Sequence, residues 1–268
     1  TLAAAATSAA GMLEVIRDQS ELKPYNAGRA AAAGLMAASV ARAGFKGPDD
    51  VLNGAHGFLK LFSESPDLEK LKRPSAPAIH SIYVKPWAAC RHSHAPVEAI
   101  LNLRKKIQVR PEEVESITVF TYGHAVHLHD HTEAASTGSA KMSTPYSVAV
   151  ALLTGRAGLE QFSPEMIARR DVQDMTRKVA VLEDPEMTRR VPAQRAARVR
   201  MIMKSGKQHE AVVELPKGEP EHPLSEEELA QKFTELATFA GKSKEECRGI
   251  IEVVHKIEDR AAGLYPFL

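Results

Sequence analysis

The N-terminal part of the chain is patterned as helices. Residues 28–43 (GRAAAAGLMAASVARA) are small and apolar on nearly every side of a helical wheel, and Gly44 follows them directly. This pattern predicts a helix that is buried on most sides, and glycine is a common residue just past a helix end. The acidic residues after Pro48 favour the start of a second helix, because carboxylates stabilise the positive end of the helix dipole. The Ala-rich residues 1–11 resemble a helix already under way, so we expect the chain to begin inside a domain.

The pattern changes at Arg73. Two prolines punctuate the chain, and residues 78–85 (AIHSIYVK) have β-type side chains without helical spacing, which predicts a strand. The periodicity farther along predicts a helix over 95–107, a strand over 114–121, a helix over 143–153, a short strand over 179–182, and a hairpin of 198–204 with 207–214.

Two capping boxes predict the C-terminal helices. Ser225 with Glu228, and Ser243 with Glu246, each place a hydroxyl at a helix start and a carboxylate three residues later. The patterns together indicate an α+β fold. Its three predicted parts are residues 1–72 of a mainly helical domain, residues 73–222 as a smaller α+β domain, and residues 223–268 as closing helices.

Charge and composition exclude several classes of partner. Lys and Arg total 35 against 34 Asp and Glu, so the chain has no broad electrostatic field to attract nucleic acid or an anionic membrane surface. The apolar stretches are shorter than the roughly 20 residues that cross a bilayer, and the two cysteines lie far apart, which fits a reducing compartment. We therefore expect a cytoplasmic protein with no nucleic-acid or membrane partner. The sequence has no P-loop or dinucleotide glycine fingerprint, so we expect no cofactor.

The densest candidate chemistry lies in residues 85–94 (KPWAACRHSH), called here the cysteine–histidine block. It places a lysine, a thiol and two imidazoles between a predicted strand and a predicted helix, where free backbone N–H groups favour an anion such as a carboxylate. Lys85 would add a point charge, and His94 would carry a proton near neutral pH. The alternative is structural: Lys85 ends a solvated strand, Cys90 belongs to the core and His94 caps the helix.

A second histidine-rich segment covers residues 124–131 (HAVHLHDH). If this segment is extended, His127, His129 and His131 share one face and suit zinc. It falls in a predicted loop, and neither a complementary cysteine pattern nor an HExxH motif supports a metal site. We therefore interpret it as structural and expect no metal.

The cysteine–histidine block resembles the K-x-[YFW]-x-x-C/H-x-x-x-H stretch of the MmgE/PrpD family, which includes 2-methylcitrate dehydratase, cis-aconitate decarboxylase and iminodisuccinate epimerase. Three further blocks resemble this family in order and spacing. They are residues 23–31 (KPYNAGRAA), residues 44–48 (GFKGP) and residues 140–146 (AKMSTPY), the last called here the lysine–tyrosine block.

The resemblance implies a fold in which the last helices rejoin the helical domain, with an active site between the two domains. Cys90 stands where the decarboxylase has a histidine. Family members are usually longer, and the resemblance makes this chain the C-terminal part, without the N-terminal half of the helical domain. The implied catalytic residues are Lys23, Lys85 and Tyr146, and the implied substrate-binding residues are Cys90, His94 and Lys141. The structural alternatives are a surface position for Lys23 and a tyrosine packed on an apolar helix for Tyr146.

These positions suit chemistry next to a carboxylate, because removing a proton there creates an enediolate-like charge that lysines stabilise. We predict a lyase that dehydrates a small hydroxy polycarboxylic acid. The enzyme alternatives are decarboxylation of the cis-aconitate type and epimerisation of a dicarboxylate. The alternative of another class is a non-catalytic subunit or remnant. As partners we expect the polycarboxylate and either a homodimer or a split-chain assembly with an N-terminal fragment.

Overall fold

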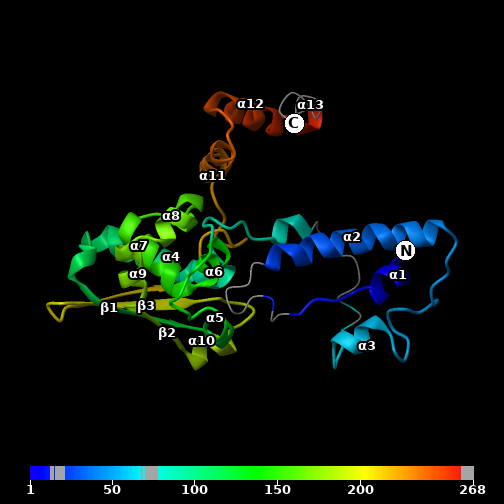
Figure 1. Cartoon of the computed structure of the whole chain (residues 1–268), viewed down its shortest axis with the longest axis horizontal. Helices are drawn as coiled ribbons and strands as arrows, with labels where there is room; N and C mark the ends of the chain where they lie inside the picture. The colour runs from blue at the N-terminus through cyan, green and yellow to red at the C-terminus, as the bar shows by residue number, and fades with distance from the viewer. Residues whose placement is uncertain (13–14, 16–21, 68, 70–77, 261–268) are drawn as a thin grey trace. The chain divides into compact units, whose positions relative to one another are not determined.

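The computed structural model describes residues 1–12, 15, 22–67, 69 and 78–260 (Figure 1). The chain divides into two compact units, residues 1–80 and 81–268, which are described separately below. The predicted boundary at residues 72–73 lies outside the described residues. Among the described helices, none has the length and hydropathy needed to cross a membrane.

The first unit consists of helices and turns. Helix α2 (Lys23–Arg42) contains most of the predicted helix, and the Ala-rich opening forms the short α1 (Leu2–Thr7), which packs on α2. The expectation that α2 is buried on most sides is wrong, because Ala37 is its one buried residue. Within this unit α2 has too few packing partners to cover it.

The helix predicted after Pro48 is also wrong. That stretch forms turns, and the next helix is α3 (Phe58–Phe62). The carboxylate of Asp50 accepts a hydrogen bond from the Asn53 N–H at 2.9 Å. A side chain that bonds to nearby backbone in this way stabilises a turn in competition with a helix.

The second unit is built on a mixed sheet with the strand order β2-β1-β3-β4. Strand β1 is parallel to β2 and antiparallel to β3, and β3 is antiparallel to β4. All four strands lie at predicted places, which confirms the α+β class. Their bounds are β1 Val114–Thr121, β2 Val179–Glu183, β3 Ala197–Met203 and β4 Gln208–Val213.

Two helices cover one face of this sheet (Figure 1). Helix α4 (His94–Ile107) packs on β3 and β4, α7 (Thr144–Thr154) packs on β2, and the two helices pack on each other. Residues of β3 alternate between buried and half-buried, with Val199 and Met201 fully buried. On the other face, the guanidinium of Arg198 lies 4.2 Å from the centre of the Phe120 ring. The core therefore lies between one sheet face and α4 and α7, and this core supports the candidate site.

Both predicted capping boxes are present, at Ser225 and Ser243, where α11 and α12 begin. The further helices of the second unit are α5 Gly123–His127, α6 Thr137–Met142, α8 Pro164–Ile167, α9 Arg170–Thr176, α10 Pro185–Arg189, α11 Glu226–Phe239, α12 Lys244–Val254 and α13 Ile257–Arg260. Single turns of 3₁₀ helix cover Ala78–Ser81, Arg91–Ser93, Pro111–Glu113 and Leu159–Phe162.

The strand predicted over residues 78–85 is wrong. Its first residues form the 3₁₀ turn, and the Val84 N–H makes a backbone hydrogen bond to the Gly218 carbonyl at 2.8 Å instead of joining a strand ladder. Ile79 and Ile82 are exposed. Side chains with high β propensity form a strand where a neighbouring strand and a buried face are available, and neither is provided here.

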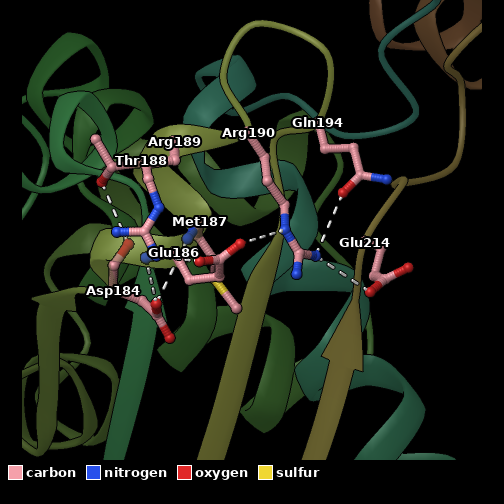
Figure 2. A network of polar contacts seen from close by, with 8 residues as sticks. All are labelled: Asp184, Glu186, Met187, Thr188, Arg189, Arg190, Gln194 and Glu214. Carbon is pink, nitrogen blue, oxygen red and sulfur yellow. Dashed lines mark hydrogen bonds and ion pairs between the residues drawn. The ribbon is translucent and has the colours of Figure 1, made fainter.

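A polar network at the end of the sheet holds α10 in place (Figure 2). The Asp184 carboxylate caps α10 by accepting from the backbone N–H of Met187 at 3.4 Å. The Arg190 guanidinium lies 3.5 Å from the Glu214 carboxylate at the end of β4. Met187 packs in a small buried cluster with Tyr122. The network therefore secures the helix that covers Tyr122, which belongs to the candidate site.

Candidate functional site

Two of the four sequence blocks meet in the second unit. The Cys90 N–H, in the cysteine–histidine block, donates to the Lys141 carbonyl, in the lysine–tyrosine block, at 2.7 Å. The buried hydroxyls of Ser93 and Thr144 lie 2.9 Å apart in a hydrogen bond. Backbone and side-chain bonds thus join segments that are about fifty positions apart in the sequence.

Local sequence explains how each block is held. The Arg91–Ser93 turn leads directly into α4, so the cysteine–histidine block is fixed by the start of a buried helix. The Ser143 hydroxyl accepts from the Tyr146 N–H at 3.1 Å and caps α7. Pro145 in the first turn is compatible with this cap, because it has no N–H to leave unpaired. Tyr146 therefore occupies a fixed place at the start of α7.

Lys85 lies at the rim of the site. Its side chain is exposed, and Nζ donates to the Ala89 carbonyl at 3.5 Å. Lys141 is half-buried in the last turn of α6. The backbone bond from Cys90 to Lys141 brings the chain segments carrying these two lysines together. The two lysines therefore lie on segments that are hydrogen-bonded to each other.

His94 is almost completely buried, with 1% of its surface exposed. Its Nε2 lies 3.4 Å from the Ala89 carbonyl, and its ring meets the Trp87 ring edge-on with the centres 5.3 Å apart. Burial, followed by the charges of Arg91 and Lys85, lowers the pKa of His94 to about 3. His94 is therefore a neutral imidazole at pH 7, held between the loop and the core.

Tyr146 is also buried. Its hydroxyl donates to the Gln161 carbonyl at 2.7 Å, and burial raises the pKa of this phenol, so it stays protonated at neutral pH. Gln161 also lines a cavity of about 340 Å³. Other residues around the cavity are Pro86, Ala88, Arg156, Lys232 and Phe239. The cavity is thus lined by residues of the cysteine–histidine block and by Gln161, whose carbonyl accepts the hydrogen bond from Tyr146.

Sequence reasoning missed a cluster formed by Cys90, His92 and His129, whose possible ligand atoms all lie within 4.8 Å of one another. The rings of His92 and His129 are stacked obliquely with centres 4.7 Å apart. Burial, followed by the charge of His129, lowers the pKa of His92 to about 3. The signal in the sequence was the second histidine segment, but only His129 from that segment joins the block. The second histidine segment is not extended, as shared zinc binding by His127, His129 and His131 would require, because His127 is the last residue of helix α5.

Lys23 belongs to the first unit. It is the first residue of α2 and its side chain is exposed. The other candidate residues, Lys85, Cys90, His94, Lys141 and Tyr146, all lie in the second unit. A role for Lys23 remains a prediction from the resemblance.

Comparison with known proteins places both units in one family. Residues 1–71 match the MmgE/PrpD N-terminal domain, and residues 87–257 match the MmgE/PrpD C-terminal domain. The resemblance found in the sequence blocks is therefore confirmed, and it extends over both units.

Two similar proteins are cis-aconitate decarboxylases of Aspergillus terreus. The first is 29% identical over an alignment of 286 residues that covers 98% of this chain and 56% of the relative. The second, from Aspergillus terreus strain NIH 2624, is 28% identical over 285 residues with the same coverage. The chain thus spans about half the length of these relatives, with 56% of each covered. With both domain models matched in chain order, the protein belongs to the MmgE/PrpD family.

Proposed function

We propose that this protein is a lyase that acts on a small polycarboxylic acid at a carbon next to a carboxylate. The observation that carries the proposal is the hydrogen-bonded junction of the two family blocks, which gathers Lys85, Lys141 and Tyr146 in one unit. The family and the two decarboxylase relatives support it.

The chemistry requires stabilisation of negative charge. When a bond at the carbon next to a carboxylate is broken, its electron pair spreads onto the carboxylate oxygens as an enediolate. Ammonium groups fixed beside these oxygens stabilise that charge more than they stabilise the substrate. We assign this role to Lys85 and Lys141, because both are cationic and lie on the joined blocks. Tyr146 keeps its phenol proton because burial raises its pKa, and it would donate this O–H to substrate by turning away from the Gln161 carbonyl.

Two reactions share this intermediate. In dehydration, a base removes the proton next to the carboxylate and hydroxide leaves from the neighbouring carbon with a proton from an acid. In decarboxylation, the bond to a carboxylate breaks, carbon dioxide leaves, and the carbanion takes a proton. The sequence analysis favoured dehydration, whereas the names of the two relatives favour decarboxylation of cis-aconitate.

Product analysis tests the proposal directly. The purified protein is incubated with cis-aconitate and, separately, with citrate-type hydroxy acids, and products are identified by NMR. Carbon dioxide with an unsaturated dicarboxylate indicates decarboxylation, and an unsaturated acid with the full number of carboxylates indicates dehydration. If neither forms in a correctly folded sample that retains its native assembly, the lyase proposal is wrong and a binding subunit becomes the better interpretation.

Substitutions then test whether Lys85 takes part in catalysis. We expect Lys85→Ala to lower kcat/KM by about 10²- to 10³-fold, the usual effect of removing a group that stabilises transition-state charge. Lys207→Ala is the matched control, because Lys207 is exposed and lies in the loop of the β3–β4 hairpin. Equal activity of the two variants would remove Lys85 from the site.

Assembly is proposed from the resemblance. We propose a homodimer or a complex with a further chain as the active form. Native mass spectrometry of an active sample measures the assembly, and an active single chain would contradict this proposal.

A further inference from the structure

The cluster of Cys90, His92 and His129 has the ligand types of a transition-metal site. One thiol and two imidazoles lie within 4.8 Å of one another. Zn²⁺ takes cysteine sulfur and histidine nitrogen as ligands at about 2.0–2.3 Å, so neighbouring ligands around a tetrahedral ion lie roughly 3–4 Å apart. Small rotations of the three side chains would therefore bring all three ligand atoms to the distance that one ion requires.

The backbone around the cluster is already fixed. The Cys90 N–H is bonded to the Lys141 carbonyl, and the His129 carbonyl accepts from the Thr144 N–H at 2.8 Å. His129 is buried, whereas Cys90 and His92 are half-buried, which gives an ion a route from solvent. The ligands are thus held by main-chain bonds that metal binding does not disturb.

Hydrogen bonds also orient the imidazoles. The His129 Nδ1 lies 2.8 Å from the Met142 carbonyl, which can only accept, so Nδ1 donates this bond and Nε2 is the nitrogen that would bind a metal ion. The His92 Nδ1 lies 2.6 Å from the Tyr122 hydroxyl. Metal-binding histidines usually have such a partner on the second ring nitrogen, which fixes the ring and the tautomer. The arrangement therefore resembles the supporting hydrogen bonds of a metal centre.

We propose that Cys90, His92 and His129 bind one Zn²⁺ ion, with the fourth position open to water or an anionic ligand. Three protein ligands with one open position are typical of zinc sites that bind exchangeable molecules. This inference rests on the cluster itself and is independent of the proposed lyase activity.

The surrounding charges set the expected preference of the fourth position. Arg91 is paired with Glu219 and acts electrostatically on His92. Arg195 acts electrostatically on His92 and on Tyr122. Cations beside the site favour an anion at the open position.

The test uses the full-length protein after removal of metal with a chelator. Zn²⁺ is titrated by isothermal calorimetry, and Co²⁺ is titrated by absorption spectroscopy, because a cobalt–thiolate bond produces a charge-transfer band. We expect one ion per chain and a thiolate band. Cys90→Ser should abolish the band and weaken Zn²⁺ binding by more than about tenfold, since even the supporting partners of ligands contribute that much.

Matched controls separate this site from the other cysteine and histidines. Cys247→Ser removes the second cysteine, and His127→Ala removes a histidine of the same segment that lies outside the cluster. Both should retain the band and the affinity. Absence of stoichiometric binding, or binding unchanged in a folded Cys90→Ser variant, would overturn the proposal. Trp87 fluorescence shows whether each variant is folded, since this residue is the chain's single tryptophan and packs on the core.

Discussion

Helices α2 and α7 have similar side chains and opposite surroundings. Both are rich in small apolar residues, but Ala37 is the one buried residue of α2, whereas residues 144–152 of α7 are all buried. Helix α7 packs on α4, α9 and β2, while α2 packs mainly on the short α1 within its unit. The comparison shows that small apolar side chains permit burial, but the surfaces provided by other elements determine it.

The largest expected effect is a cavity in α7. Leu152 is fully buried, so Leu152→Ala should lower the free energy of unfolding of the second unit by about 2–5 kcal/mol. Met36→Ala on α2 is the control, because Met36 is 69% exposed and its loss should cost less than about 0.5 kcal/mol. Urea titration followed by Trp87 fluorescence measures the transition of the second unit, and far-UV circular dichroism in the same titration also detects unfolding of the helical first unit that contains Met36. A large shift from Met36→Ala would show that the contrast between the helices does not hold in solution.

A smaller effect is expected at the glycines that end the two helices. Gly155 and Gly44 have φ values of 74° and 91°, in the left-handed region. Alanine there costs about 1–2 kcal/mol, and a Cβ on Gly155 would also lie 2.9 Å from the Arg104 guanidinium. We expect Gly155→Ala to lower the free energy of unfolding measured by Trp87 fluorescence by this amount, and Gly44→Ala to leave that free energy unchanged. Equal changes in that free energy would mean that the two units unfold together.

The smallest effect is expected in the network of Figure 2. Arg190 is partly exposed and its carboxylate partners Glu186 and Glu214 are more exposed, so Arg190→Ala should cost less than about 1 kcal/mol. The loss should shrink as salt is added, because exposed ion pairs are screened. The same Trp87 titration at low and high salt measures it. A salt-independent loss of several kcal/mol would show that Arg190 supports the buried Tyr122 cluster through packing.

The sequence predicted the parts of the fold whose patterns are local and complete. β1 has the bounds predicted for it, and the capping residues Ser225 and Ser243 mark real helix starts. Two of the failures occurred where structure depends on distant partners. Residues 78–85 have strand-forming side chains without an adjacent strand, and α2 has an apolar sequence without covering elements.

The candidate site was predictable in part for the same reason. The resemblance pointed to Lys85, Cys90 and Tyr146 by their positions in blocks, and the structure places all three in one unit. The contact of Cys90 with His129 depends on how two loops pack, and no periodicity or spacing encodes it. Sequence alone therefore found the blocks but missed the cluster between them.

The position of β1 in the sheet has a consequence for protein synthesis. β1 lies between β2 and β3, and both of these strands come later in the chain. As the ribosome releases the polypeptide, one edge of β1 stays without its partner β2 until residue 183 has emerged, and the other edge stays without β3 until residue 203 has emerged. Unpaired strand edges are sites of aggregation in nascent chains. A pause in translation before that point would therefore leave a completed central strand exposed to neighbouring chains, and a chaperone that covers β1 would protect it during this interval.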